Sequence, residues 1–409
     1  MDHTENYIKT MLSFAQFNEA ALTKNTHMVH LEDGLLKSES GNILVAGILE
    51  EILEKLKPAG KSTAEVSVKW DGSPAIVFGT DPSNKKFFVG TKAALSKNSK
   101  ACYSDADVDK YYGDKPALNK LLKASLKYLS KIKKGKGVYQ GDLMFADNIK
   151  KKKKIDGETN VIFKPNTIVY AVPQSSKALY ATLDKAKYGI VIHTVYSGSL
   201  TLSNMVSSFN VKMSDFKTNS DVWFDDAFIK DSSAALFSKA EGAELSKLIA
   251  SLRKTSTAKA IKKLNDLKAI PIIEKFLVRS AIEQKFSYNL KEQLKFMEEW
   301  IRSTGETEAM KLKSEAGQQK KRDQYNTVAD MTQSDPDLIT LVDAQLTVIK
   351  AKKIIMDKLN QIGNMSTFIE KGDGFEVTTP EGFCAISAER GVFKIVDRLN
   401  FSAVNATSH

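Results

Sequence analysis

A strand–turn–strand pattern over residues 66–79 constrains the fold of this chain more than any other segment. Apolar and β-branched residues run on both sides of a Gly-Ser-Pro break, which predicts two short strands joined by a sharp turn. The turn presents the run Lys69-x-Asp71-Gly72, so a lysine stands at the mouth of a tight connection. Partial burial beside Trp70 favours the neutral amine, which is the form that attacks an electrophile. Lys69 is therefore a candidate covalent nucleophile.

The size and composition of the chain suit a globular protein with more than one substructure. Its 409 residues and 42% hydrophobic content allow large cores, and this length predicts two domains or one domain with a large insertion. The formal net charge of +11 suits a polyanionic partner such as a nucleic acid or a nucleotide.

The cysteines and the apolar runs predict where the protein works. Cys102 and Cys384 lie far apart and have no neighbours at metal-ligand spacing, which argues for a reducing compartment and against a disulfide framework or a zinc site. The first residues show no basic segment followed by an apolar run, and eighteen consecutive apolar residues occur nowhere. We expect a cytoplasmic protein without a signal peptide or a membrane span.

Changes in periodicity along the chain predict its organisation. Residues 1–60 are expected to be mainly helical, and residues 61–224 are rich in strand signals around one amphipathic helix at residues 115–133. Helical periodicity dominates residues 225–370, and strand patterns return in residues 371–409. The simplest architecture is an α+β domain that is split by a helical insertion.

Three polar segments each have two explanations. The five lysines of residues 150–154 predict a solvated loop, with a nucleic-acid contact as the alternative. The basic residues of the insertion, such as Lys311 and Lys313, either bind nucleic-acid phosphates or belong to a bundle that packs on itself. His27 and His30 lie beside two acids, so they either bind a metal or a substrate phosphate, or they form a helix-terminus cap or a polar cluster against the nucleotide domain.

Further residues that fit one reaction lie in the strand-rich segments, in a fixed order along the chain. A lysine that attacks a nucleotide needs positive charge on the α-phosphate, which Lys394 can supply from an apolar strand. It needs carboxylates for a divalent metal, which Asp142 and Glu381 can supply. A ring can stack on the base, and His193 and Tyr196 are the candidates.

This ordered set resembles the covalent nucleotidyltransferase superfamily, which comprises the ATP-dependent DNA and RNA ligases and the mRNA capping enzymes. Its signatures are Lys-x-Asp-Gly, an acidic strand, an aromatic strand, Glu-Gly-apolar and a lysine-bearing final strand. The runs 381–383 and 393–395 are particularly similar to phage-type RNA ligases, and the resemblance covers residues 64–200 and 375–400. It implies an ATP-grasp-like ligase adenylation domain of antiparallel sheets flanked by helices. The expected cofactors are ATP, with GTP as the alternative donor, and Mg²⁺ or Mn²⁺. The expected partners are RNA or DNA ends.

The resemblance also implies roles for single residues. Lys69 would form the lysyl-nucleotide, a lysyl-AMP when ATP is the donor, and Asp71 would orient the turn that ends at Gly72. Asp142 and Glu381 would bind the metal and the sugar. Two lysines, Lys92 and Lys394, would contact phosphates.

Four positions depart from the pattern of this superfamily, and one of them is Asp142, where its members usually have glutamate. Most ligases have glutamate where this chain has Ser67, many have arginine at Pro74, and the final strand usually carries a second lysine at Val396. Ser67 and Val396 favour a second hypothesis, in which a catalytically degenerate fold binds nucleic acid or serves in assembly. A third hypothesis keeps the covalent chemistry but makes the protein a capping-type guanylyltransferase.

Overall fold

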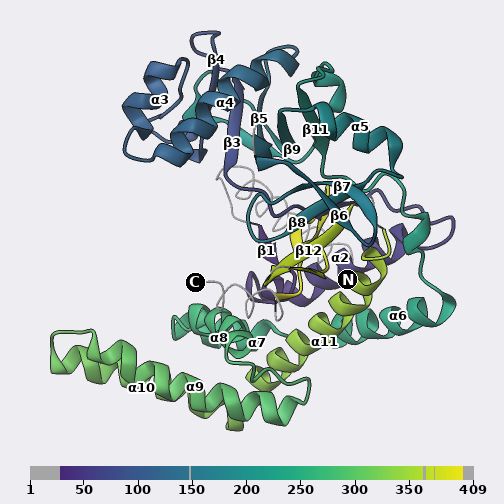
Figure 1. The fold of residues 1–409 in the computed structure, drawn as a ribbon. Helices are drawn as coiled ribbons and strands as arrows, with labels where there is room; N and C mark the ends of the chain where they lie inside the picture. The colour runs from purple at the N-terminus through teal and green to yellow at the C-terminus, as the bar shows by residue number, and fades with distance from the viewer. Residues whose placement is uncertain (1–27, 147–148, 363–364, 373, 399–409) are drawn as a thin grey trace, which may run out of the picture. The chain divides into compact units, whose positions relative to one another are not determined.

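The described residues of the computed structural model form an α+β fold (Figure 1). They comprise residues 28–146, 149–362, 365–372 and 374–398. Their contacts divide into two compact units. The first unit holds the described residues within Ser67–Ile229 and Gly363–Glu381, and the second holds those within Met28–Val66, Lys230–Ile362 and Gly382–His409.

A six-stranded sheet forms the core of the first unit. Its strands run in the order β10-β9-β5-β3-β4, and β11 pairs in parallel with β9. The strands are β3 (Ala75–Thr80), β4 (Phe87–Gly90), β5 (Val138–Ala146), β9 (Tyr188–Ser197), β10 (Val206–Ser208) and β11 (Val222–Asp226).

The central strands β3 and β5 are buried on both faces, so apolar residues follow one another along β3 and point alternately to either side of the sheet. In β3, Ile76 and Phe78 pack on one side, with Leu122 and Leu129 of α4 (Pro116–Ile132) in the same core. The helix α3 (Asp105–Tyr112) belongs to this layer as well. Proline at the first position of α4 starts this helix, because proline has no N–H to leave unpaired there.

A second sheet of the first unit has the strand order β13-β12-β8-β7-β6, and all of its pairs are antiparallel. The strands are β6 (Lys151–Ile155), β7 (Glu158–Phe163), β8 (Val169–Pro173), β12 (Ser366–Lys371) and β13 (Gly374–Val377). The helix α5 (Lys177–Lys185) contacts β7 and β8.

The prediction of a loop for the lysine run is wrong, because most of this run forms the edge strand β6. Lysines on an edge strand block pairing with other chains, so this placement has a physical use. Lys153 lies 4.3 Å from the centre of the Phe375 ring. Lys150 precedes the strand and donates hydrogen bonds to the carbonyl oxygens of Asp184 (2.8 Å) and Ala186 (2.6 Å) at the end of α5.

The second unit contains a smaller sheet in the order β1-β15-β14-β2. Its strands are β1 (Val29–His30), β14 (Gly382–Ser387), β15 (Gly391–Ile395) and β2 (Glu65–Lys69), which runs on into the first unit. β1 is parallel to β15, and β14 is antiparallel to it. The 3₁₀ helix η1 (Glu32–Leu36) and the helix α2 (Gly41–Lys55) follow β1, so the part of residues 1–60 that is described is helical apart from this short strand.

Helices account for most of the expected insertion. They are α6 (Lys239–Lys254), α7 (Ala258–Asp266), α8 (Ile270–Ile282), α9 (Leu290–Met310), α10 (Glu315–Ser334) and α11 (Pro336–Leu359). The expected strands near the C-terminal end correspond to β13, β14 and β15, of which β13 lies in the first unit and the other two in the second. Among the helices of the described ranges, none has both the length and the apolar character needed to cross a membrane.

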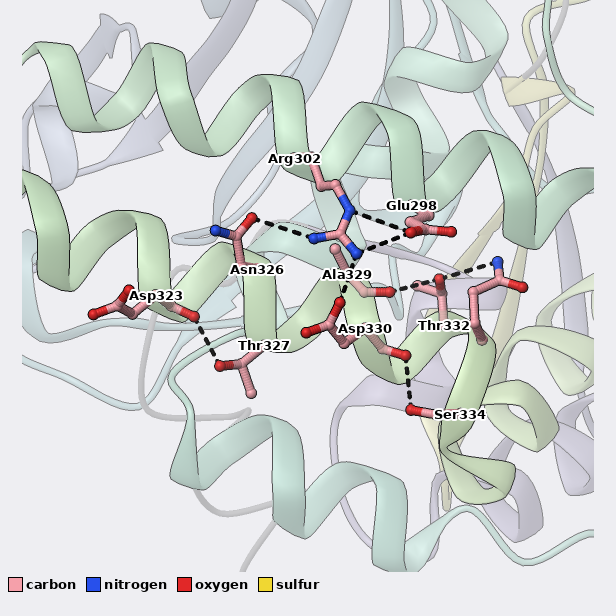
Figure 2. A network of polar contacts seen from close by, with 10 residues as sticks. Glu298, Arg302, Asp323, Asn326, Thr327, Ala329, Asp330, Thr332 and Ser334 are labelled. Atoms are coloured by element: carbon pink, nitrogen blue, oxygen red, sulfur yellow. Dashed lines mark hydrogen bonds and ion pairs between the residues drawn. The ribbon is translucent and has the colours of Figure 1, made fainter.

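The helices α9 and α10 form an antiparallel hairpin that is held by polar contacts. Figure 2 shows Arg302 of α9 between an acid on its own helix and polar residues of α10. Its guanidinium donates to Glu298 (2.9 Å) and to Asp330 (2.5 Å), and it reaches Asn326 at 3.4 Å. These pairs show that part of the positive charge of this hairpin is neutralised within it.

Candidate active site

The turn after β2 is anchored by the buried carboxylate of Asp71. Its Oδ1 accepts a hydrogen bond from the side chain of Asn166 (2.8 Å). Its Oδ2 accepts from the backbone N–H groups of Thr167 (2.7 Å) and Ile168 (2.9 Å). The backbone N–H of Asp71 donates to the hydroxyl of Tyr170 at 2.8 Å. The carboxylate thus joins the turn to the loop before β8, which supports the predicted orienting role.

Two neighbours of Asp71 fix the turn from either side. The indole of Trp70 packs 5.1 Å from the ring of Tyr170 and 6.2 Å from the ring of Trp223. A Cβ on Gly72 would lie 2.6 Å from the Cβ of Asp142, closer than carbon atoms approach without a shift. Only glycine therefore lets the turn lie against β5 at the position of Asp142.

Lys69, at the end of β2, forms an ion pair with Glu381. Its ammonium nitrogen contacts Oε2 of the carboxylate, and the two side chains are 22% and 10% exposed. Burial raises the pKa of Glu381 above its ordinary value, Lys69 opposes this effect, and the negative charges of Asp71 and Asp142 add to it. The structure thus brings four of the predicted residues into one electrostatic cluster.

Asp142 and His193 lie on neighbouring strands of the six-stranded sheet. Nε2 of His193 is 3.5 Å from Oδ1 of Asp142, and its Nδ1 is 2.8 Å from the hydroxyl of Thr194. The register of β5 and β9 shifts at this point, because Gln140 opposes Thr194 whereas the next residue of β5 opposes Ile192. His193 is the extra residue of this bulge, and bulges commonly redirect a side chain next to an active site.

Tyr196, the second predicted ring, is buried in an apolar cluster of the first unit. The residue is only 4% exposed, and it packs among apolar residues such as Val77 and Phe88. Its hydroxyl donates to Oε1 of Gln140 at 2.7 Å, and burial raises the pKa of Tyr196 to about 12. No face of this ring is open to a nucleotide base, so His193 is the better placed of the two predicted rings.

The two predicted phosphate-binding lysines belong to two further elements, one in each unit. Lys92 is exposed at the first position of the 3₁₀ helix η2 (Lys92–Leu95), where the hydroxyl of Thr91 caps the helix. Among the described residues, none forms an ion pair with Lys92. Lys394 is half-buried in β15 of the second unit, where it pairs with His30 and its carbonyl oxygen accepts from the N–H of Leu31 at 3.1 Å.

Comparison with known proteins gives one family. A family model described as a family of unknown function, DUF6267, matches residues 25–409. The chain belongs to the DUF6267 family. No curated protein and no solved structure matches it.

The second unit of this DUF6267 protein contains a cluster of buried ion pairs near Lys394. Lys352 of α11 is 3% exposed and donates to Glu32, which is 1% exposed, at 2.7 Å. Arg398 donates from one nitrogen to both oxygens of Asp33, at 2.9 and 3.0 Å. Buried charges are retained only when they are paired in this way.

The sequence predicts one side of this cluster but not the other. His30 lies beside two acids in the sequence, and the structure shows a polar cluster there, formed within the second unit. His27 lies outside the described residues. Lys352 was missed, although it stands between Ala351 and Ile355 on a buried face of α11. A lysine inside an apolar helical stripe was the signal that could have found it.

The described part of this DUF6267 protein contains no group of three or more His, Cys, Asp or Glu side chains arranged to bind a metal. Asp142 and Glu381 are the two predicted ligands, and both belong to the cluster around Lys69.

Proposed function

We propose that this protein is a covalent nucleotidyltransferase that forms a lysyl-AMP at Lys69 and acts on RNA or DNA ends as a ligase. The observation that supports this most is the ion pair of Lys69 and Glu381. These two residues stand far apart in the chain, and the resemblance to ligases assigns both of them to one nucleotide site. The anchored turn at Asp71 and the position of Asp142 against it support the same proposal.

The chemistry begins with the proton on Lys69. The ammonium transfers one proton to Glu381, whose raised pKa makes it a better acceptor than an exposed glutamate. The neutral amine then attacks the α-phosphorus of ATP, so that a P–N bond forms and the bond to the bridging oxygen breaks. Pyrophosphate leaves with the electron pair of that bond, and the second proton on nitrogen passes to solvent. The product is a phosphoramidate on Lys69.

The acidic residues of the cluster also fit a divalent cation. Asp142 and Glu381 offer the oxygen ligands that Mg²⁺ prefers. The negative charge of Asp142 contributes to the raised pKa of Glu381, so the two carboxylates interact electrostatically. When it is bound, the ion supplies positive charge to the triphosphate. The carboxylate of Asp71 already accepts three hydrogen bonds, so we assign it the role of holding the turn and not that of a metal ligand.

The resemblance to ligases also assigns a phosphate contact to Lys394, which belongs to β15 of the second unit. The net charge of +11 suits a nucleic-acid substrate for the second half of the reaction.

Incubation of the protein with ATP labelled at the α-phosphate and Mg²⁺ tests this proposal. We expect a label that resists denaturation and that mass spectrometry locates on Lys69. Lys69→Ala should abolish it. Lys164→Ala is the matched control, because it removes another Lys–Glu pair of the first unit, with Glu370 at 2.6 Å, and should keep the label.

Two outcomes would contradict the proposal. One is the absence of label on the wild type, and the other is a label that survives Lys69→Ala. Preference for labelled GTP over ATP would point instead to the capping-type guanylyltransferase.

A further inference from the structure

A basic segment of the first unit has no role in the proposed chemistry. Residues 115–136 carry eight lysines and no acidic residue. They are Lys115, Lys120, Lys123, Lys127, Lys131, Lys133, Lys134 and Lys136. Most of this segment is α4, and the apolar face of that helix packs on the six-stranded sheet. The lysines therefore have to occupy the remaining surface of the helix.

A groove of about 870 Å³ lies along this helix. The start of β4 and the residues around the start of α3 form its other walls, and Figure 1 shows these elements beside α4. Asp105 is the single acid in its lining. The cations in its lining are Lys86, Lys120, Lys123 and Lys127.

Most of this positive charge is not neutralised by the protein. Lys123 forms an ion pair with Asp109 at 2.7 Å, and Lys127 lies 5.1 Å from the ring centre of Tyr128. Lys86 and Lys120 form no ion pair with any residue in the described part of the chain. A polyanion that enters the groove can therefore bind these ammonium groups without displacing an acid.

The hairpin of α9 and α10 differs in this respect, because residues 290–334 carry as many acidic as basic side chains. Lys311 pairs with Glu308 at 2.8 Å, and Arg322 pairs with Glu306 at 2.9 Å. Arg302 is held between two acids in the same way (Figure 2). These cations of the hairpin are paired with acids of the same hairpin. The groove along α4 is therefore the better candidate for binding phosphates.

Two aromatic rings add a second kind of contact. Phe87 and Tyr103 line the groove, and both are half-buried. The hydroxyl of Tyr103 donates to Oδ2 of Asp81 at 2.5 Å, which fixes the orientation of this ring. Exposed ring surface beside lysines is typical of proteins that bind single strands, because unpaired bases stack on the rings while the backbone follows the charge.

We propose that the groove along α4 binds single-stranded nucleic acid. This proposal rests on the proposed function and extends it, because it names the surface of the first unit that holds the polynucleotide. Lys120 and Lys127 are two helical turns apart, so the rise of an α-helix separates them by about 10 Å. This length spans more than one phosphate of a strand.

Fluorescence anisotropy with a labelled 20-nucleotide single strand, in RNA and DNA versions, tests the inference between 50 and 200 mM NaCl. Lys120→Gln/Lys127→Gln should weaken binding about tenfold at 50 mM, and it should make the slope of log affinity against log salt shallower by about 1.4, since each phosphate contact on a single strand contributes about 0.7. Phe87→Leu should weaken binding about fivefold without changing this slope, because it removes stacking but no charge.

Lys177→Gln/Lys185→Gln is the matched control. Both lysines are exposed on α5 of the same unit with similar spacing, and their loss should change binding less than twofold. Binding no weaker in the groove variant than in this control, or tighter binding of a duplex than of the single strand, would overturn the inference. The binding assay contains no ATP, so it does not depend on the reaction at Lys69. A loss of strand binding and a loss of labelling at Lys69 are therefore separate results.

Discussion

The ammonium of Lys69 contacts the carboxylate of Glu381, although one residue ends β2 and the other stands just before β14. Both side chains are largely shielded from water, and the ammonium of Lys69 opposes the rise that burial causes in the pKa of Glu381. The cluster also contains the anchored Asp71 and Asp142. The first prediction follows from this pair.

Replacement of Glu381 by glutamine should slow label transfer from ATP to Lys69 about a hundredfold, which is typical for the loss of a general base. It should also change the pH dependence. The raised pKa of Glu381 means that its acid form persists above the usual range for glutamate, so the wild-type rate should rise as pH increases through that pKa. In Glu381→Gln this acid limb should disappear. Initial labelling rates between pH 5 and 8 measure both effects.

The control for this variant is Glu370→Gln, which removes an exposed glutamate of β12 that pairs with Lys164. Exposed ion pairs contribute little, about 0–1 kcal/mol, so this variant should label at the wild-type rate. An unchanged rate and pH profile in Glu381→Gln would exclude the proton-accepting role.

Gly72→Ala should disrupt the turn. The added methyl group would lie 2.6 Å from the Cβ of Asp142, so the turn has to move away from β5. We expect a loss of about 1–3 kcal/mol in the free energy of unfolding, as for other overpacked positions. The labelling rate of the folded protein should fall at least tenfold. Gly242→Ala in α6 is the control, because its nearest neighbours would be 3.9 Å away and alanine favours a helix.

Local patterns made much of the candidate site predictable. The apolar alternation on both sides of Lys69-x-Asp71-Gly72 predicted β2, the turn and β3, and the spacing of the leucines predicted α4. The order of Asp142 and Glu381 along the chain predicted residues that the structure places in the same cluster.

Contacts between distant segments were not predictable from local patterns. The lysines of β6 have low strand propensity, and pairing with β7 and the ring beside Lys153 override it. The burial of Tyr196 depends on packing against β3 and β4. The partner of Glu32 is a lysine of α11, hundreds of residues later in the chain, so no window of the sequence contains this pair.

Asp71→Asn should destabilise the first unit. Oδ1 and Oδ2 of Asp71 both accept hydrogen bonds, whereas asparagine has only one oxygen and leaves at least one buried donor unpaired. We expect a loss of about 2 kcal/mol in urea unfolding. Asn166→Ala removes only one of these bonds and should cost about 1 kcal/mol. A smaller loss for Asp71→Asn than for Asn166→Ala would contradict the anchoring role.

The last prediction concerns His30, which lies in the cluster of ion pairs in the second unit. Burial lowers the pKa of His30 to about 3, Glu32 opposes this effect, and the positive charges of Arg398, Lys352 and Lys394 add to it. His30 is therefore neutral in the folded protein at pH 5, whereas the unfolded chain binds a proton there with the ordinary histidine pKa of 6.5. The unfolded state binds more protons between these two values, so stability is present above the unfolded pKa and is lost as pH falls.

On going from pH 8 to pH 5, the wild type should lose about 2 kcal/mol more unfolding free energy than His30→Gln, which has no titrating group at this position. Asp33 works in the opposite direction, because burial raises its pKa to about 6 and folding then gains from acid. This contribution is present in both proteins and cancels in the difference. Urea unfolding of both proteins at pH 8 and pH 5 gives that difference directly. Parallel losses in the two proteins would show that His30 accepts its proton in the folded state as readily as in the unfolded chain.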